Sequence, residues 1–82
     1  MAKSLHTNAN AKLIGVIVRA RKSSGLTQQT VADRLGKPQS YVAKIEGEER
    51  RLDVAEFVEL AHAVDADPKD LFGKFLKELD AR

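Results

Sequence analysis

The sequence has no cysteine and no tryptophan, and it has few prolines and few aromatic residues. Without cysteine, the chain can form neither a disulfide framework nor a cysteine-based zinc site. Its two histidines, His6 and His62, lie too far apart for the ligand spacing of a zinc motif. We therefore expect no metal and no cofactor.

Long hydrophobic runs are also missing. The longest apolar stretch, Leu13 to Val18, is far shorter than the roughly 20 residues that a membrane span needs. The N-terminus carries Lys3 but lacks the apolar segment of a signal peptide. We expect a cytoplasmic protein with no membrane partner. No nucleophile–base set and no phosphate-binding glycine loop are evident, so the sequence does not indicate an enzyme.

Charge is unevenly distributed along the chain. Residues 1–44 carry eight Lys and Arg against one Asp, a net charge of +7, and residues 45–82 carry six against eleven acidic residues, a net charge of −5. This asymmetry is typical of a protein that turns a basic face toward a polyanion, although a charged half can also be a solvated surface.

Helical patterns fill most of the sequence, and no strand pattern competes with them. Residues 1–10 are polar and aperiodic, which predicts a flexible tail. The chain of 82 residues has room for one domain with a small core, which we place at residues 11–82. Apolar residues recur with helical spacing in five segments after this tail. The predicted helices begin near Asn10, after Thr27, at Pro38, after Asp53 and at Pro68.

Capping residues mark where these helices begin and end. Thr27 is a favourable N-cap, and Asp53 with Glu56 has the spacing of a capping box. Gly25 and Gly36 can take the left-handed conformation that follows a helix. Gly73 lies inside the last predicted helix, where it favours a bend or a break.

The stretch from Leu26 to Gly47 is the most informative part of the sequence. Two short helices meet there at a turn that contains Gly36. Ala32 is small enough to let the next helix approach closely, and Val42 is spaced to pack against Val31 and Ala32. This pattern leaves the N-terminal half of the helix at 38–46 projecting from the domain, as entry into a DNA major groove requires.

These residues resemble the Cro/CI-type (XRE-like) helix-turn-helix repressors. The positions that carry the resemblance, which spans about Ile14 to Phe72, are Leu26-Thr27-Gln28, Ala32, Gly36, Gln39-Ser40 and Ile45-Glu46-Gly47. The small size and the segment Asp67 to Phe72 also resemble the controller proteins of restriction–modification systems.

The resemblance implies an all-α, five-helix domain of lambda-repressor-like type, with the helix-turn-helix at about 27–46. It implies a sequence-specific, double-stranded DNA-binding transcriptional regulator of repressor or controller type, whose recognition helix is 38–46. Base contacts are expected from Gln39, Ser40, Tyr41 and Lys44. Phosphate contacts are expected from Thr27, Gln28, Lys37, Arg50 and Arg51. Arg21, on the inward face of the first helix, is expected to pair with Glu46.

Alternatives remain beside these assignments. Tyr41 could cover the helix surface, and Lys37 and Lys44 could be solvated charges. Glu48 and Glu49 place negative charge beside the expected phosphate contacts. The alternative function is a helix-turn-helix protein-interaction module of a co-activator or antitoxin-like kind, which would expose apolar residues on the third helix.

The last helix, 68–80, is a candidate dimerisation element. Its apolar stripe is larger than a chain of this size can easily cover. We expect Phe72 in the monomer core, and Phe75, Leu76 and Leu79 in a homodimer interface. The alternative is that these three fold back onto the first helix. A homodimer would bind a two-fold symmetric operator, and we expect no small-molecule ligand.

Overall fold

The computed structural model describes the backbone of residues 2–80 and the side chains of residues 9–80. Within this part of the chain the fold has five α-helices and no strand. The helices are α1 (Ala2–Ser23), α2 (Gln28–Leu35), α3 (Gln39–Glu46), α4 (Val54–Ala63) and α5 (Pro68–Asp80). No described helix is long and apolar enough to cross a membrane. The described residues do not include Met1, at the start of the predicted tail, or Ala81 and Arg82, at the end of the predicted domain. The side chain of His6 also lies outside them.

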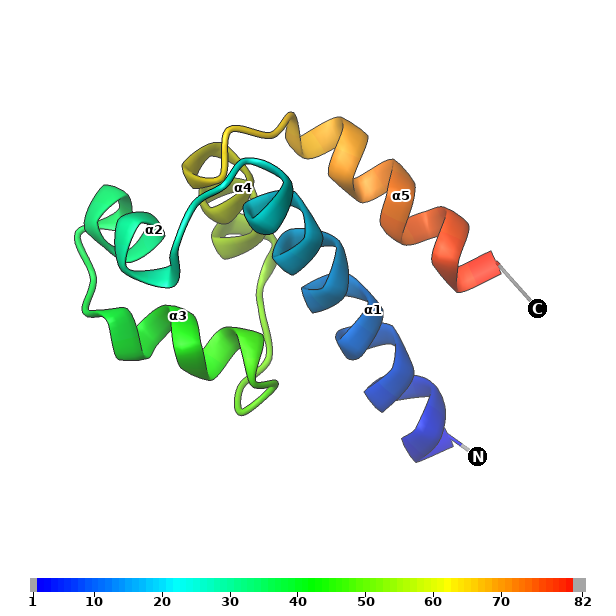
Figure 1. The fold of residues 1–82 in the computed structure, drawn as a ribbon. Helices are drawn as coiled ribbons and strands as arrows, with labels where there is room; N and C mark the ends of the chain where they lie inside the picture. The colour runs from blue at the N-terminus through cyan, green and yellow to red at the C-terminus, as the bar shows by residue number, and fades with distance from the viewer. Residues whose placement is uncertain (1, 81–82) are drawn as a thin grey trace.

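The longest helix, α1, is central to the arrangement. α5 runs antiparallel along one side of it, and α3 contacts it on another (Figure 1). α4 contacts both α2 and α5, and it closes the domain behind the helix-turn-helix (Figure 1). The all-α, five-helix architecture predicted from the sequence is confirmed.

The predicted start of the first helix near Asn10 is wrong. α1 begins at Ala2, so the backbone of residues 2–10 is helical and Asn10 lies within the helix. Neither proline nor glycine occurs between Ala2 and Asn10, so nothing in the segment interrupts the helix once its C-terminal half packs on the core. The polar composition of residues 2–10 gave no sign that α1 extends through them.

The other helix boundaries follow their caps. Thr27 Oγ1 accepts a hydrogen bond from the Thr30 amide at 3.1 Å, which caps α2. Asp53 and Glu56 form the predicted capping box at the start of α4. Gly36, at φ 69°, ends α2 in the left-handed conformation. Pro38 is the N-cap of α3 rather than its first residue, and α5 continues without a break through Gly73.

The core lies where all five helices meet. Its largest fully buried side chains are Ile14, Ile17, Ile45, Leu60, Val31, Val42 and Val64. Leu71 anchors α5, while Phe75 is half-buried against this cluster. The prediction that Phe72 belongs to the core is wrong, because its side chain is 45% exposed. Leu71 and Phe75 take the inward positions of α5, and Phe72 is left beside Phe57 at the edge, with ring centroids 6.0 Å apart.

Glu48 adopts a left-handed backbone conformation immediately after Gly47, the C-cap of α3. Its φ is 62°, a value that costs an ordinary L-residue about 1–2 kcal/mol and costs glycine little. We expect Glu48→Gly to raise the free energy of unfolding by about 0.5–1 kcal/mol, measured by urea denaturation. The matched control is Glu49→Gly. Glu49 has no positive φ, so this control should lower stability. Equal destabilisation by both variants would contradict the assigned strain.

Candidate nucleic-acid interface

The two helices of the helix-turn-helix are held by a small apolar contact. Val31 and Ala32 of α2 and Val42 and Ile45 of α3 are all buried. Ala32 has no side chain beyond Cβ, so α3 can pack closely against α2, and Gly36 allows the sharp reversal between them. α3 therefore lies at the domain surface with one face free (Figure 1).

The free face of α3 is polar. Gln39, Ser40 and Lys44 are exposed, which matches the outward orientation predicted for them. Tyr41 is different, because its side chain is half-buried and packs against the core cluster. Of the four residues predicted to contact bases, three thus extend outward and one leans back onto the protein.

A bidentate ion pair joins α1 to the end of α3. Arg21 Nε lies 2.6 Å from Glu46 Oε2, and an Arg21 terminal nitrogen lies 2.9 Å from Glu46 Oε1. The other terminal nitrogen of Arg21 donates to the Leu26 carbonyl at 2.8 Å. The two side chains are only 12% and 9% exposed. Such a pair is fixed in geometry, and loss of one partner leaves a buried charge unpaired.

Two glutamines extend this ion pair to the start of α3. Gln28 Nε2 donates to Glu46 Oε1 at 2.8 Å, and Gln39 Nε2 donates to Gln28 Oε1 at 2.7 Å. The hydrogen bonds therefore run from α1 through both helices of the helix-turn-helix. They hold the first side chain of α3 in one orientation, although that side chain is exposed. Sequence reasoning identified each residue separately, but it did not identify this chain of contacts.

Tyr41 lies among three charged side chains, one that precedes α3, one that follows it and one in the first turn of α4. Lys37 Nζ and Arg50 Cζ lie 5.2 and 5.4 Å from the centre of its ring. Glu56 Oε2 accepts a hydrogen bond from Arg50 at 2.8 Å and one from the Tyr41 hydroxyl at 3.4 Å. Burial, followed by the charge of Glu56, raises the pKa of the Tyr41 hydroxyl. The hydrogen bonds from Arg50 and from the Asp53 backbone lower the pKa of the Glu56 carboxyl.

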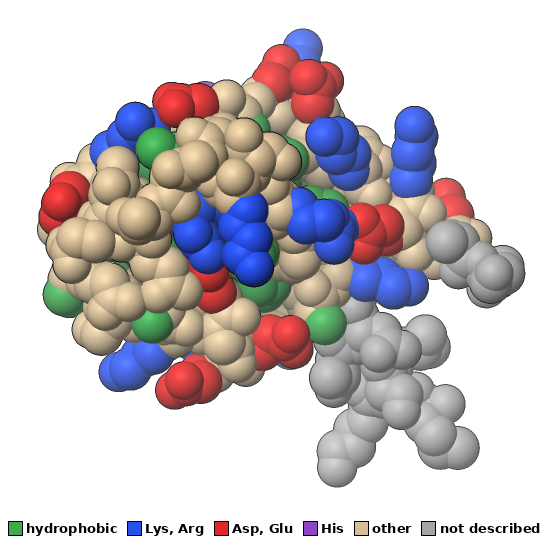
Figure 2. Space-filling view, viewed as in Figure 1, with side chains coloured by type: hydrophobic (Ala, Val, Ile, Leu, Met, Phe, Trp, Pro, Cys, Tyr) green, Lys and Arg blue, Asp and Glu red, His purple; other side chains and the backbone are tan. Residues whose placement is uncertain are grey.

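Ion pairs within the domain neutralise part of the positive charge carried by the first half of the sequence. Arg19 pairs with Glu78, and Arg34 lies 3.0 Å from Asp65, so two more cations of the basic half are paired with acids of the other half. Figure 2 shows lysine and arginine side chains on one face of the domain, with acidic side chains beside several of them. Within the described residues Lys37 and Lys44 form no ion pair, which leaves their charges for a partner.

The remaining predicted phosphate contacts occupy different surroundings. Thr27 and Gln28 lie at the N-terminus of α2, where Thr27 caps the helix. Arg51 is exposed and lines a small groove of about 190 Å³ with Asn10 and Leu13 of α1. Arg51 is therefore placed toward α1, whereas Arg50 is placed beside Tyr41 of α3.

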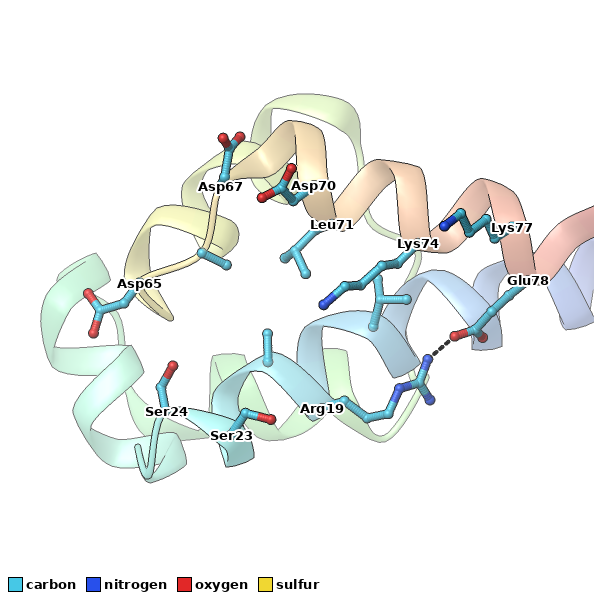
Figure 3. Close-up of a pocket in the computed structure, with 13 residues that line it drawn as sticks. Arg19, Ser23, Ser24, Asp65, Asp67, Asp70, Leu71, Lys74, Lys77 and Glu78 are labelled. Carbon is cyan, nitrogen blue, oxygen red and sulfur yellow. Dashed lines mark hydrogen bonds and ion pairs between the residues drawn. The ribbon is translucent and has the colours of Figure 1, made fainter.

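A larger groove lies between α1 and α5, outside the helix-turn-helix. It has a volume of about 690 Å³ and an apolar floor that includes Val16 and Leu71. Three acidic side chains gather at one end, and the basic ones lie toward the other, where Glu78 pairs with Arg19 (Figure 3). The labelled charges are Asp65, Asp67 and Asp70 toward the α4–α5 turn, and Lys74, Lys77, Arg19 and Glu78 toward the far end of α5.

The exposed apolar residues form part of another surface. Among the described residues the large exposed hydrophobic side chains are Val54 (80%), Phe72 (45%), Leu76 (44%) and Leu79 (37%). Leu76 and Leu79 thus do not fold back into the core, whereas Phe75 largely does. Val54 was not identified from the sequence as an exposed apolar residue, and it is exposed although it precedes the buried Phe57 by three positions and Ala61 by seven. It lies in the first turn of α4, where it remains exposed.

Comparison with known proteins agrees with this geometry. A helix-turn-helix family model matches residues 17–71. An XRE-family like protein from Pseudomonas syringae pv. tomato is 39% identical, with a TM-score of 0.87 over 94% of each chain. The restriction–modification controller protein C.AhdI from Aeromonas hydrophila is 31% identical, with a TM-score of 0.71 over 82% of this chain and 97% of that one. The wild-type controller protein C.Esp1396I shares the fold at 22% identity, with a TM-score of 0.81 over 90% of this chain and 95% of that one. No curated protein matches the sequence.

The ion pair between Arg21 and Glu46 gives a stability prediction. Glu46→Ala leaves the Arg21 charge buried without a partner, so it should lower the free energy of unfolding by about 3–5 kcal/mol. Glu49→Ala is the control, since Glu49 is an exposed acid close to the same helix end and forms no ion pair within the described residues. Thermal melts of both variants, followed by circular dichroism, test this prediction. A Glu46→Ala midpoint no lower than that of Glu49→Ala would contradict it.

Proposed function

The chain belongs to the XRE-type helix-turn-helix family of DNA-binding transcription regulators, and on this premise we propose that α3 reads base edges in the major groove of duplex DNA. The observation that carries the proposal is the polar, exposed face of α3 opposite its buried Val42 and Ile45. A helix of this kind fits the width of the major groove. Gln39, Ser40 and Lys44 are the proposed base contacts.

Gln39 is proposed to read adenine. One N–H of its amide is engaged by Gln28, which leaves the Gln39 carbonyl oxygen and a second N–H for a base. Adenine presents a matching donor and acceptor in the major groove, whereas guanine presents two acceptors. Lys44, a donor only, suits guanine, and the Ser40 hydroxyl suits either base.

Phosphate contacts are proposed around this helix. Lys37 precedes α3 and Arg50 follows it, so the two cations can reach the DNA backbone on both sides of the reading face. The α2 N-terminus, with Thr27 and Gln28, favours an anion through its backbone amides and helix dipole. Arg51 is proposed to reach a more distant phosphate on the side of α1.

The rival function as a protein-interaction module has less support. Such a module would present apolar side chains on α3, yet the large exposed apolar side chains of the described region lie on α4 and α5. We therefore assign α3 to DNA and the apolar surface to a second copy of the chain.

Binding to duplex DNA tests the main proposal. The affinity should fall as salt rises, with a log–log slope of about −0.9 for each phosphate neutralised. Gln39→Ala should cost about 1–3 kcal/mol on the preferred duplex and relax selection at one base pair, as measured by selection from a random pool. Arg50→Ala should instead weaken binding to all sequences alike.

The control for this experiment is Gln29→Ala. Gln29 is also an exposed glutamine of the helix-turn-helix, but it bonds Asp33 within α2 at 2.9 Å. Its removal should leave the selected sequence unchanged. If the wild-type protein binds no duplex at low salt, the proposed function is wrong. If Gln39→Ala selects the wild-type sequence, α3 is not the reading helix.

We also propose that the regulator is a homodimer on a two-fold symmetric operator. The apolar face that supports this proposal consists of Val54, Phe72, Leu76 and Leu79. A two-fold axis would place this face against its own copy and set two α3 helices about 34 Å apart, one DNA turn. Phe75 was predicted to be part of the interface, but its half-buried position gives it a smaller share.

Sedimentation tests the dimer. Leu76→Glu should shift the protein toward the monomer, because it places a charge in an apolar contact. Lys77→Gln changes the net charge by the same amount at the adjacent residue, which lines the α1–α5 groove instead, and it should leave association intact. An unchanged dimer in Leu76→Glu, or a wild-type monomer on DNA, would refute this interface.

The type of regulation is proposed from the relatives. The 31% identity with C.AhdI, a restriction–modification controller protein, favours a controller or repressor type of regulator. A protein that works on DNA in this way would act in the cytoplasm. No enzymatic step, cofactor or small-molecule ligand enters the proposal.

A further inference from the structure

Tyr41 links the two ends of α3 through its ring. Lys37, which precedes the helix, and Arg50, which follows it, both lie within about 6 Å of the ring centre, the range of cation–π attraction. The ring is half-buried on the core and so cannot extend freely toward a base. Its position assigns Tyr41 to holding two cations in place, instead of to the base contact predicted from the sequence.

Glu56 divides its two carboxylate oxygens between two tasks. Oε1 accepts from the Asp53 amide at 3.1 Å and completes the capping box of α4. Oε2 accepts from Arg50 at 2.8 Å and from the Tyr41 hydroxyl at 3.4 Å. Oε2 thus accepts from two donors, Arg50 and Tyr41, that a DNA phosphate could use. Oε1 instead stabilises the start of α4.

We propose that Glu56 is an internal competitor for a DNA phosphate at the Lys37–Tyr41–Arg50 cluster. This inference rests on the proposed function. A phosphate that binds Arg50 competes with Glu56 Oε2 for the guanidinium, which Glu56 contacts through one terminal nitrogen, because two negative charges at this short separation repel each other. The Asp53 hydrogen bond to Oε1 can persist through this exchange, so α4 keeps its cap.

The competition lowers the affinity for DNA without changing the sequence preference. Phosphates carry no base identity, so the cost of displacing Glu56 is the same on the preferred duplex and on a random one. A partly exposed surface ion pair of this kind contributes little, and its replacement corresponds to a change in affinity of about two- to fivefold. Glu56 therefore affects the affinity for DNA of any sequence, whereas Gln39 and its neighbours determine which sequence is preferred.

Glu56→Gln is the test variant. Glutamine at this position still accepts from the Asp53 amide, so the capping box is retained, but the charge opposite Arg50 is lost. Fluorescence anisotropy with a random-sequence duplex and with the selected duplex should show about two- to fivefold tighter binding to both. The control is Glu59→Gln, which removes an exposed charge from the same helix without touching Arg50.

The gain should depend on Arg50. In an Arg50→Ala background, Glu56→Gln should change the affinity no more than Glu59→Gln does, because the competed cation is gone. Equal gains from Glu56→Gln and Glu59→Gln, a gain that persists without Arg50, or weaker binding by Glu56→Gln would overturn the inference. If the wild-type protein binds no duplex at all, the proposed function fails instead.

A measurement on the unsubstituted protein makes the test independent of the variant's folding. When the random-sequence duplex is added, the carboxyl carbon resonance of Glu56 should shift in the NMR spectrum as Arg50 leaves it. The carboxyl resonance of Glu59 is the internal control and should stay in place. A Glu56 resonance that is unchanged at saturating DNA would contradict the exchange.

Discussion

The buried ion pair between Arg21 and Glu46 fixes α3 relative to the rest of the domain. α3 is an eight-residue helix, too short to be stable by itself, and it contributes only Val42 and Ile45 to the core at full burial. The guanidinium of α1 holds its C-terminal turn through two hydrogen bonds and also binds the carbonyl of Leu26 before α2. Both helices of the helix-turn-helix are thereby attached to one side chain of the central helix.

This attachment extends to the surface that is proposed to read DNA. Glu46 also accepts from Gln28, and Gln28 accepts from Gln39, so the orientation of an exposed amide depends on a buried charge. Preorganisation of this kind reduces the conformational entropy that a reading side chain loses on binding. The same contacts couple the packing of α3 to the proposed recognition surface, because Gln28 bonds both Glu46 and Gln39.

Small size shapes the rest of the surface. A domain of this length buries a smaller share of its surface than a larger one does, and α5 packs on the core mainly through Leu71 and Phe75. Phe72, Leu76 and Leu79 then remain at the surface together with Val54. Most arginines near the helix-turn-helix are likewise engaged within the domain. Arg19 and Arg34 form ion pairs within the domain, so Lys37 and Lys44 are the lysines of the helix-turn-helix whose charges are left for a partner.

Features that depend on local chemistry could be predicted from the order of the residues. The caps at Thr27 and Asp53, the turn at Gly36 and the inward stripe of α4 all follow from residue types and spacing within a few positions. Features that depend on contacts between distant segments could be seen only in the folded chain. Helical periodicity predicts the face of the helix on which Phe72, Tyr41 or Val54 lies. It does not predict how much of that side chain a neighbouring helix buries. For the same reason, the link from Glu46 to Gln39 and the second contact of Glu56 with Arg50 emerged only when the chain was folded.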